Sequence, residues 1–371
     1  MRVIIDATSL LLRSAGVKSH IYHWLTAMRQ IAGYDAVRAF PFIGKTGALD
    51  HERSMFPLWA TYPRLAVLYG VNLAGSAALD WFMQGADVFH ASNQVHHAPR
   101  NAKLTATVFD LTTAKMPEVH TAANVKADQW YAEQILKRAD GLMAISESTR
   151  HDAIEILGIP EDKIETIHLG VPDAYFRVPV ADVLHVKEFY GLTKPYVLSL
   201  GTIEPRKNID RLMDAWLDLP PHLREQYELL IAGPAGWASA NTLRRITAGA
   251  QGVRHLGYVP EEALPGLTAG ALVLAYPSLY EGFGLPLAQA MAAGVAAVTS
   301  NVSSLPEVAG EGAELVDPLS VSEIKSALMR LLENDTLRER RAAQGRDKAQ
   351  NYRWQRNARR SLDFFERVAG R

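Results

Sequence analysis

The feature that most constrains the fold is an alternation of short apolar runs with helical patterns, which occurs twice along the chain. Most of the runs are almost continuous Val, Ile, Leu and Ala, as expected for strands covered by helices on both faces. Strand and helix in alternation predict parallel, doubly wound sheets. The predicted strands lie at residues 2–8, 37–42, 86–91, 104–111, 141–146 and 164–170, and then at 195–201, 227–233, 253–259, 271–278, 295–300 and 313–318.

The two halves of this pattern predict two domains. The break falls at "VPDAYFRVPVADVLHVKEFYGLTKP", where Pro, Gly and polar residues interrupt the alternation. A length of 371 residues also suggests two domains, at roughly 150 residues each. We therefore predict an α/β protein with Rossmann-like domains at 1–175 and 190–350, and a final helix at about 352–371 that could pack back on the first domain. The other predicted helices lie at 17–31, 124–139, 147–157, 208–219, 285–293 and 321–332.

Composition narrows the class of protein. There are 39 basic and 40 acidic residues, a net charge of −1, so the overall charge gives no sign of a nucleic-acid partner. The absence of cysteine excludes disulfides and thiolate metal sites. The chain opens with "MRVIIDATSL", which predicts a strand rather than a leader, and it has no uninterrupted apolar run long enough to span a membrane. We expect a soluble, cytoplasmic protein.

Two segments each allow two interpretations. Residues 55–84 are rich in Trp, Tyr, Phe and Leu, and they could form helices packed on the first domain or a surface for an apolar acceptor or a membrane. The Arg-rich tail "LRERRAAQGRDKAQNYRWQRNARR" could form solvated helix faces or could bind anionic lipid head groups.

The stretch "YPSLYEGFGLPLAQAMAAG" places a carboxylate and two glycines where a predicted strand leads into a helix. A helix start leaves backbone N–H groups unpaired and carries partial positive charge. Gly282 and Gly284 would let that backbone approach a ligand, and a phosphate would fit there. Glu281 would repel a phosphate, so it suits sugar hydroxyls beside one. The alternative is a tight turn with a capping acid.

A second loop, "SLGTIEPRKNIDRL", follows the predicted strand at 195–201 and carries Arg206 and Lys207. Two adjacent cations there suit a diphosphate, which Arg can grip in bidentate fashion and Lys can meet as a mobile point charge. The helix dipole disfavours cations at a helix start, which argues against ordinary surface charges. In a third loop, "SAGVKSHIYHWL", Gly16 could let backbone approach a ligand or could be a simple loop glycine. Ligands of such sheets bind beyond the carboxyl ends of the strands, so the predicted site is the cleft between the two halves.

Most of the chain resembles the retaining glycosyltransferases of family 4, which have the GT-B fold. The resemblance is carried by segments such as "AISESTRHDAIEILGIPEDKIETIHLGV", "YVLSLGTIEPRKNIDRLMDAW" and "HLGYVPEEALPGLTAGALVLAYPSLYEGFGLPLAQAMAAGVAAVTSN". Overall likeness favours bacterial mannosyltransferases of surface-polysaccharide synthesis, which often use GDP-mannose. The resemblance implies retaining transfer of a hexose from a nucleoside diphosphate sugar to a hydroxyl of a glycan or lipid-linked acceptor. It implies no metal or other cofactor, and it admits peripheral contact with the inner face of the membrane.

The resemblance also assigns roles to residues. Arg206 and Lys207 match the pair that binds the donor diphosphate, and Glu281 matches the first acid of the family's Glu-x7-Glu motif, which contacts the transferred sugar. We expect these three residues and Asp110 to be catalytic. The other donor-binding residues that the resemblance implies are Gly16, Gly201, Thr202, Tyr258, Val259, Gly282, Phe283, Gly284, Leu285 and Gln289.

Two departures from the family pattern are the grounds for an alternative function. Gln289 stands where the motif has its second acid, which accepts hydrogen bonds from ribose, so we expect weaker ribose binding. Phe109 precedes Asp110, where many relatives have a histidine that positions the donor sugar. The alternative is a nucleotide-sugar-binding or scaffold subunit with weakened catalysis; a GT-B epimerase or phosphorylase is a further one, although we find no cofactor lysine site for a phosphorylase. Candidates for the vacant histidine role, each of which could instead be a loop or packing histidine, are His90, His96 and His97.

Overall fold

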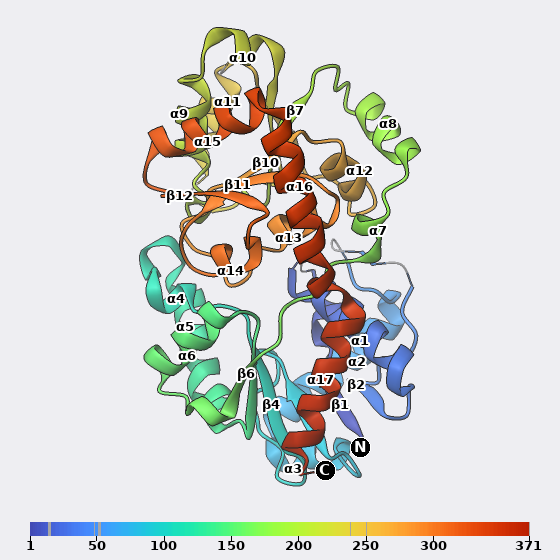
Figure 1. The fold of residues 1–371 in the computed structure, drawn as a ribbon. Coiled ribbons are helices and arrows are strands. Elements are labelled where there is room, and N and C mark those ends of the chain that lie inside the picture. The colour runs from blue at the N-terminus through green and yellow to red at the C-terminus, as the bar shows by residue number, and fades with distance from the viewer. Residues whose placement is uncertain (14–15, 48, 51–52, 238, 250, 371) are drawn as a thin grey trace. The chain divides into compact units, whose positions relative to one another are not determined.

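The computed structural model describes residues 1–13, 16–47, 49–50, 53–237, 239–249 and 251–370. The chain divides into two compact units, each with its own sheet (Figure 1). Unit 1 consists of Met1–Gly170 and Trp354–Arg371, and unit 2 of Val171–Arg353. The segment 171–195, which we expected to be a linker, belongs to unit 2 and is largely helical. Its prolines start helices instead of breaking them, because Pro172 and Pro179 stand at the N-caps of two short helices.

Unit 1 is built on a parallel sheet that confirms the strands predicted in the first half. The strands are β1 (Val3–Asp6), β2 (Val37–Phe40), β3 (Val88–Ala91), β4 (Lys103–Val108), β5 (Gly141–Ala144) and β6 (Ile164–Thr166). Within the described residues the order is β2-β1-β3-β4-β5-β6. The chain leaves β1 toward one edge of the sheet and passes from β3 toward the other. The carboxyl ends of β1 and β3 are therefore a switch point, where doubly wound sheets bind ligands.

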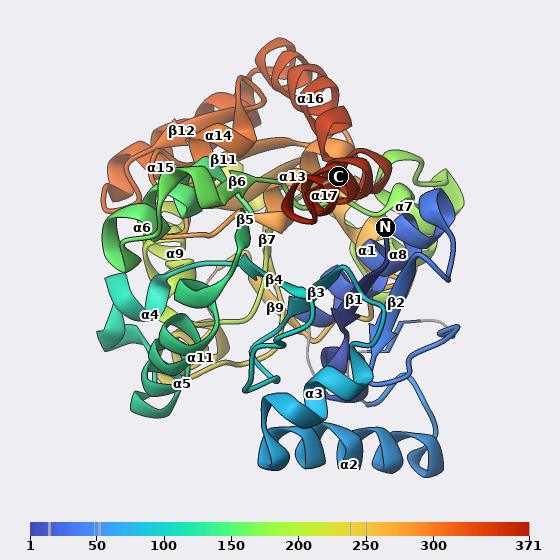
Figure 2. The same ribbon diagram turned by 90° about the horizontal axis from the view of Figure 1, so that it is seen from below.

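Helices cover both faces of this sheet, as its nearly continuous apolar strands require (Figure 2). One face packs on α1 and α17, where the Trp24 indole N–H donates to the Ser361 hydroxyl at 2.9 Å. The other face packs on α2, α3, α5 and α6. The helices of unit 1 are α1 (Gly16–Ala32), α2 (Leu58–Ala74), α3 (Ser76–Phe82), α4 (Thr112–Lys115), α5 (Ala122–Gln134), α6 (Glu147–Leu157) and α17 (Trp354–Val368).

Unit 2 repeats the design and confirms the strands predicted in the second half. They are β7 (Tyr196–Leu200), β8 (Glu228–Ala232), β9 (Val253–Gly257), β10 (Val273–Tyr276), β11 (Ala296–Ser300) and β12 (Ala313–Val316). In the part of the chain that the structure describes, they lie in the order β12-β11-β10-β7-β8-β9, all parallel. From β7 the chain winds outward through β8 and β9, and from β10 it winds the other way. The switch point of unit 2 therefore lies at the carboxyl ends of β7 and β10.

The helices of unit 2 also lie on both faces of its sheet (Figure 1). Apolar residues of α9, α10, α11 and α15 join one core cluster around the fully buried Trp216, while α13 and α16 pack beside β11 on the other side. The helices are α7 (Asp173–Phe176), α8 (Val180–Phe189), α9 (Ile209–Leu217), α10 (Pro221–Gln226), α11 (Ala240–Thr247), α12 (Leu264–Ala269), α13 (Leu285–Ala292), α14 (Leu305–Ala309), α15 (Val321–Glu333) and α16 (Asp335–Ala349).

The Arg-rich tail forms α16 and α17, and several of its arginines bond within their own unit. Arg341 reaches Glu314 at 2.9 Å, and Arg353 reaches Asp173 at 3.0 Å. These ion pairs favour the interpretation of the tail as packed, solvated helices over a lipid-binding segment. No helix among the described residues is long and apolar enough to cross a membrane.

Candidate active site

The two loops singled out in the second half of the sequence meet at the switch point of unit 2. One follows β7 and carries Arg206 and Lys207; the other follows β10 and carries Glu281. β7 and β10 are hydrogen-bonded neighbours, with Val273 opposite Val197. Because parallel neighbours end at the same edge of a sheet, residues that lie 74 or 75 positions apart in sequence come into direct contact.

Arg206 is the centre of this contact. Its Nη1 donates to Glu281 Oε2 at 2.6 Å and to the Tyr280 carbonyl at 2.9 Å. Its Nη2 donates to Glu204 Oε1 at 2.7 Å. The guanidinium is therefore fixed by two carboxylates and a carbonyl, and little of the Arg206, Glu204 or Glu281 side chain is exposed.

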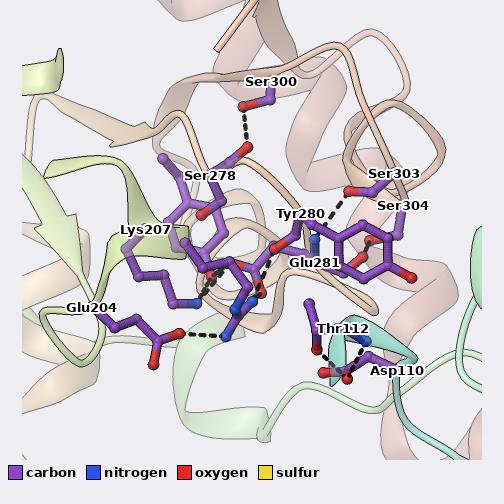
Figure 3. A network of polar contacts seen from close by, with 12 residues as sticks. Asp110, Thr112, Glu204, Lys207, Ser278, Tyr280, Glu281, Ser300, Ser303 and Ser304 are labelled. Atoms are coloured by element: carbon purple, nitrogen blue, oxygen red, sulfur yellow. Dashed lines mark hydrogen bonds and ion pairs between the residues drawn. The ribbon is translucent and has the colours of Figure 1, made fainter. Parts of the chain in front are cut away.

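Lys207 is held by the same carboxylate (Figure 3). Its Nζ donates to Glu281 Oε1 at 2.7 Å and to the Tyr276 hydroxyl at 2.6 Å, and that hydroxyl donates to Glu281 Oε1 at 2.7 Å. Burial alone would raise the pKa of Glu281, but Lys207, Arg206 and the Tyr276 hydroxyl outweigh it and lower the pKa to about 2. Glu281 is consequently an ionised hydrogen-bond acceptor at neutral pH. Burial lowers the pKa of Lys207, and the Glu281 carboxylate opposes that change.

The backbone around Glu281 is fixed from the next loop. The Glu281 N–H donates to the Ser303 hydroxyl at 3.0 Å, and the Ser304 hydroxyl donates to the Glu281 carbonyl at 2.9 Å (Figure 3). Helix α13 then begins after Gly284, whose φ of +88° is in the left-handed region that favours glycine. These two hydrogen bonds and the left-handed glycine fix the turn that leads into the helix.

Asn208 joins the two loops and has a conformation rare for a non-glycine residue. Its Nδ2 donates to the Pro277 carbonyl at 2.9 Å and to the Pro318 carbonyl at 2.7 Å, and its φ is +59°. A left-handed residue here turns the chain from the short 3-10 helix Pro205–Lys207 into α9. Sequence analysis missed this residue, although an Asn directly before a helix start was a usable signal. The other missed residues of this site are Glu204, Tyr276, Ser303 and Ser304.

The remaining predicted donor residues of unit 2 lie at or near the same edge. Gly201 and Thr202 open the loop after β7, and a Cβ on Gly233 would overlap the Gly201 carbonyl oxygen, so the loops after β7 and β8 approach closely. Tyr258 is half-exposed just beyond β9, and the next residue, Val259, is buried. Gly282 is buried in the loop before α13, while Leu285, its first residue, and Gln289, one turn further on, are partly buried. Phe283 is buried against Tyr352, with which its ring makes an edge-on contact.

Unit 1 carries the other predicted residues. Gly16, exposed and in open space, begins α1. Asp110 follows β4 and accepts hydrogen bonds from the Thr112 hydroxyl and, at 3.1 Å, from the Thr112 N–H. It lines a cavity of about 220 Å³ whose wall also includes Asn93, Asp128 and Gln129. Burial raises the pKa of Asp128; a hydrogen bond from Thr113 opposes this rise and the nearby Asp110 carboxylate adds to it.

The histidines proposed for the vacant role have other partners. Both ring nitrogens of His90 contact threonine hydroxyls, at 3.1 and 3.0 Å, and burial lowers its pKa to about 3. His96 packs edge-on against Trp130, and His97 Nε2 lies 2.9 Å from the Asn72 carbonyl. These contacts favour packing and loop roles for all three.

His20 is the histidine that lies beside Phe109. Their ring centroids are 5.2 Å apart in an edge-on arrangement. The ring of His20 is buried, and neither of its nitrogens has a hydrogen-bond partner among the described residues. Sequence analysis missed this residue because it comes from α1, far from Phe109 in the chain.

Among the described residues no three His, Asp or Glu side chains are grouped as a metal site. Two cations and an ionised carboxylate lie together at the switch point of a Rossmann-like unit, the place where such sheets bind ligands. Among solved structures, sucrose-phosphate synthase from Thermosynechococcus elongatus superposes with a TM-score of 0.74 over 100% of each chain, at 19% identity. The chain therefore has the GT-B fold of glycosyltransferases.

Sequence comparison gives the family. Residues 14–175 match the family model described as Glycosyltransferase Family 4, and residues 182–348 match Glycosyl transferases group 1. The O-antigen chain mannosyltransferase B of Escherichia coli is 35% identical over 272 residues, which cover 72% of this chain and 71% of that protein. The serotype-specific mannosyltransferase WbdA of Escherichia coli is 29% identical over 62% of this chain, and the match spans 29% of WbdA. The chain therefore belongs to the glycosyltransferase family that these two models describe, and it is a glycosyltransferase.

Proposed function

We propose that this glycosyltransferase moves mannose from GDP-mannose to a hydroxyl of a glycan or lipid-linked acceptor, with retention at the anomeric carbon and with no metal or other cofactor. The observation that carries the proposal is the cluster of Arg206, Lys207 and Glu281 at the switch point of unit 2. The choice of mannose as the transferred sugar is supported by the 35% identical relative, which is named a mannosyltransferase. In surface-polysaccharide synthesis such an acceptor would be carried on a lipid, and the enzyme would work at the inner face of the membrane.

The cations would act on the leaving group. As the bond between the anomeric carbon and the phosphate oxygen stretches, negative charge grows on the diphosphate. Arg206 and Lys207 are already oriented by Glu204, Glu281 and Tyr276, so they would stabilise that charge without reorganising. Removing one donor of this kind typically costs about 10²–10³ in rate.

The carboxylate would act on the sugar. Because the pKa of Glu281 is lowered to about 2, it accepts hydrogen bonds from sugar hydroxyls and does not supply a proton at neutral pH. In the proposed same-face step, the acceptor oxygen bonds to the anomeric carbon as the phosphate oxygen leaves. The acceptor proton passes to that leaving oxygen, so no separate protein base is required.

The acceptor would use the cavity of unit 1. Its wall combines two carboxylates, Asp110 and Asp128, and the amides of Asn93 and Gln129 with apolar side chains. Sugars present hydroxyls that donate to carboxylates and C–H faces that pack on apolar groups. Such a lining suits a glycan hydroxyl better than an anionic acceptor group.

A ligand panel followed by a transfer assay tests the proposal. GDP and GDP-mannose should raise the unfolding temperature more than UDP, ADP or their sugars, because only a ligand of the folded state stabilises it. With a mannose-terminated acceptor, the product should contain an α-linkage when it is identified by NMR. A larger shift with uridine ligands, or a β-linked product, would contradict the proposed donor or the proposed retention.

A further inference from the structure

The cavity of unit 1 has a polar mouth and an apolar interior. It lies where the chain leaves the carboxyl ends of β3 and β4. The wall residues that carry a carboxylate or an amide are exposed, and they are Asn93, Asp110, Asp128 and Gln129. Apolar wall residues are buried in the core of unit 1, and they include Val108, Ala132 and Leu136. A ligand that enters therefore meets hydrogen-bonding groups first and hydrocarbon behind them.

Three hydroxyls of the wall already have partners inside unit 1. The Thr107 hydroxyl lies 3.0 Å from His90 Nε2, and the Ser92 hydroxyl donates to the buried carboxylate of Asp6. The Tyr131 hydroxyl donates to a backbone carbonyl at 3.4 Å. A ligand hydroxyl carried past the mouth would lose its water without gaining one of these groups as a free partner, which weakens binding.

The mouth, in contrast, keeps unused hydrogen-bond acceptors. Both hydrogen bonds that Asp110 accepts end on its Oδ1, so its Oδ2 has no partner among the described residues. The amide of Gln129 can both donate and accept at the same mouth. Hydroxyls on one edge of a sugar would therefore be paired here, while the opposite edge would face hydrocarbon.

The volume of the cavity limits what can enter. At about 220 Å³ it is smaller than the pockets of roughly 300–1,000 Å³ that enclose drug-sized ligands, so it suits one sugar ring and not an oligosaccharide. The ring of Phe109, which also lines the cavity, offers an apolar surface to the C–H groups of that ring. A pyranose matches this wall best when its inner edge carries a methyl group where an ordinary hexose carries only hydroxyls.

We infer that the acceptor ends in a sugar that bears a methyl group, and that this methyl group lies in the apolar interior of the unit 1 cavity. Two kinds of sugar have this chemistry, a 6-deoxyhexose and an N-acetylhexosamine. The inference rests on the proposed function, which places the acceptor in this cavity. A fully hydroxylated sugar would also enter, but more weakly, because its inner hydroxyl would stay unpaired.

Transfer to matched pairs of acceptors tests the inference. Octyl α-mannoside is compared with octyl 6-deoxy-α-mannoside, and octyl β-glucoside with octyl N-acetyl-β-glucosaminide, with GDP-mannose as the donor and the full chain as the enzyme. In at least one pair, kcat/KM should be about tenfold or more higher for the methyl-bearing sugar. The pair that shows the preference identifies which of the two sugars is recognised. Equal values within both pairs, or higher values for the fully hydroxylated sugars, would overturn the inference.

A single hydroxyl placed in the apolar wall tests where the preference arises. Ala132→Ser should reduce it by about threefold or more, because the new hydroxyl can pair with a hydroxylated sugar. The matched control is Ala153→Ser, the same change at a fully buried alanine of the same core that lies outside the described wall of the cavity. The control should keep the preference, and circular dichroism should show that both variants are folded. An unchanged preference in folded Ala132→Ser, or an equal loss in both variants, would overturn the inference.

Saturation-transfer NMR without donor separates this inference from the proposed function. When the methyl-bearing acceptors bind the full chain, their methyl protons should be saturated more strongly than their ring protons, and Ala132→Ser should reduce the difference. This pattern without any transfer from GDP-mannose would contradict the proposed function alone. Transfer at equal kcat/KM within both pairs, or equal saturation of methyl and ring protons, would contradict this inference alone.

Discussion

Replacing Arg206 with Ala should weaken unit 2 and its catalysis by two separate routes. Arg206 lies 2.6 Å from one carboxylate oxygen of Glu281 and 2.7 Å from one of Glu204, and these side chains are only 8% and 4% exposed. Removing one partner of a buried ion pair costs about 3–5 kcal/mol. Water can enter the vacated space, so we expect the lower end, about 3 kcal/mol. Loss of a preorganised donor to the leaving group should also slow transfer by about 10²–10³.

A charge-balanced variant separates the two routes. Glu204→Gln with Arg206→Met removes one anion together with one cation and keeps much of the side-chain volume. Most of the lost stability should return, since one carboxylate no longer lacks its partner. Transfer should stay reduced by about 10² or more, because the hydrogen-bond donor that we propose for the diphosphate is still missing. The control is Lys325→Ala, which removes a partly exposed cation on α15 that is paired with Asp218. It should change neither stability nor transfer strongly.

Urea unfolding measures stability, and initial rates at saturating donor and acceptor measure transfer. The single variant Arg206→Ala should lose both stability and transfer. The double variant should recover stability but not transfer. If the double variant regained wild-type transfer, Arg206 would serve only to neutralise buried carboxylates, and its proposed role at the diphosphate would be wrong.

Three further changes test the same site. The pKa of Glu281 is lowered from its ordinary value of 4.5 to about 2. Its ionised form therefore stabilises the fold fully above pH 4.5 and less as the pH falls toward 2. In urea titrations, the difference in unfolding free energy between the wild type and Glu281→Gln should shrink by roughly 3 kcal/mol across that pH range. Glu281→Gln should also bind GDP more tightly in calorimetry while transferring more slowly, because it leaves both cations less neutralised. Asn208→Asp should destabilise unit 2 by about 1–3 kcal/mol and slow transfer, since a carboxylate cannot donate to the two carbonyls that Asn208 joins, and unchanged unfolding would contradict the bridging role. Gln289→Glu should tighten nucleotide binding if Gln289 faces ribose, and calorimetry without a change would count against that placement.

The fold was largely readable from the sequence because strands buried on both faces leave a strong apolar signal. All twelve predicted strands correspond to strands of the described residues. Helix ends were less certain: the helix predicted at 124–139 is α5, which ends at Gln134 and is followed by the 3-10 turn Leu136–Arg138. Local sequence does not specify such a tightening of the last turn, because tertiary packing decides it.

The site was readable only for residues that carry their own signal. Arg206, Lys207 and Glu281 stand in loops marked by glycine, proline and charge, so they could be predicted. Tyr276 is the last residue of an apolar strand, and its hydroxyl gains meaning only once β10 pairs with β7 and meets Lys207. Strand order is a property of the folded sheet, so the role of the Tyr276 hydroxyl could not be predicted from its own segment. Glu204, in contrast, could have been predicted, because an acid two residues before Arg206 is a potential ion-pair partner.

The departures from the family pattern lie outside the described contacts of the charged cluster. Gln289 and Phe109 were the grounds for considering a subunit with weakened catalysis. Yet the contacts described above that orient Arg206 and Lys207 come from Glu204, Tyr276, Tyr280 and Glu281, not from the two departures. A chain that had lost selection for leaving-group stabilisation would have little reason to keep two cations buried beside carboxylates, because buried ion pairs often stabilise a fold no better than apolar side chains would. The cost of desolvating these charges is most simply explained by a ligand that carries its own negative charge to the same edge of the sheet.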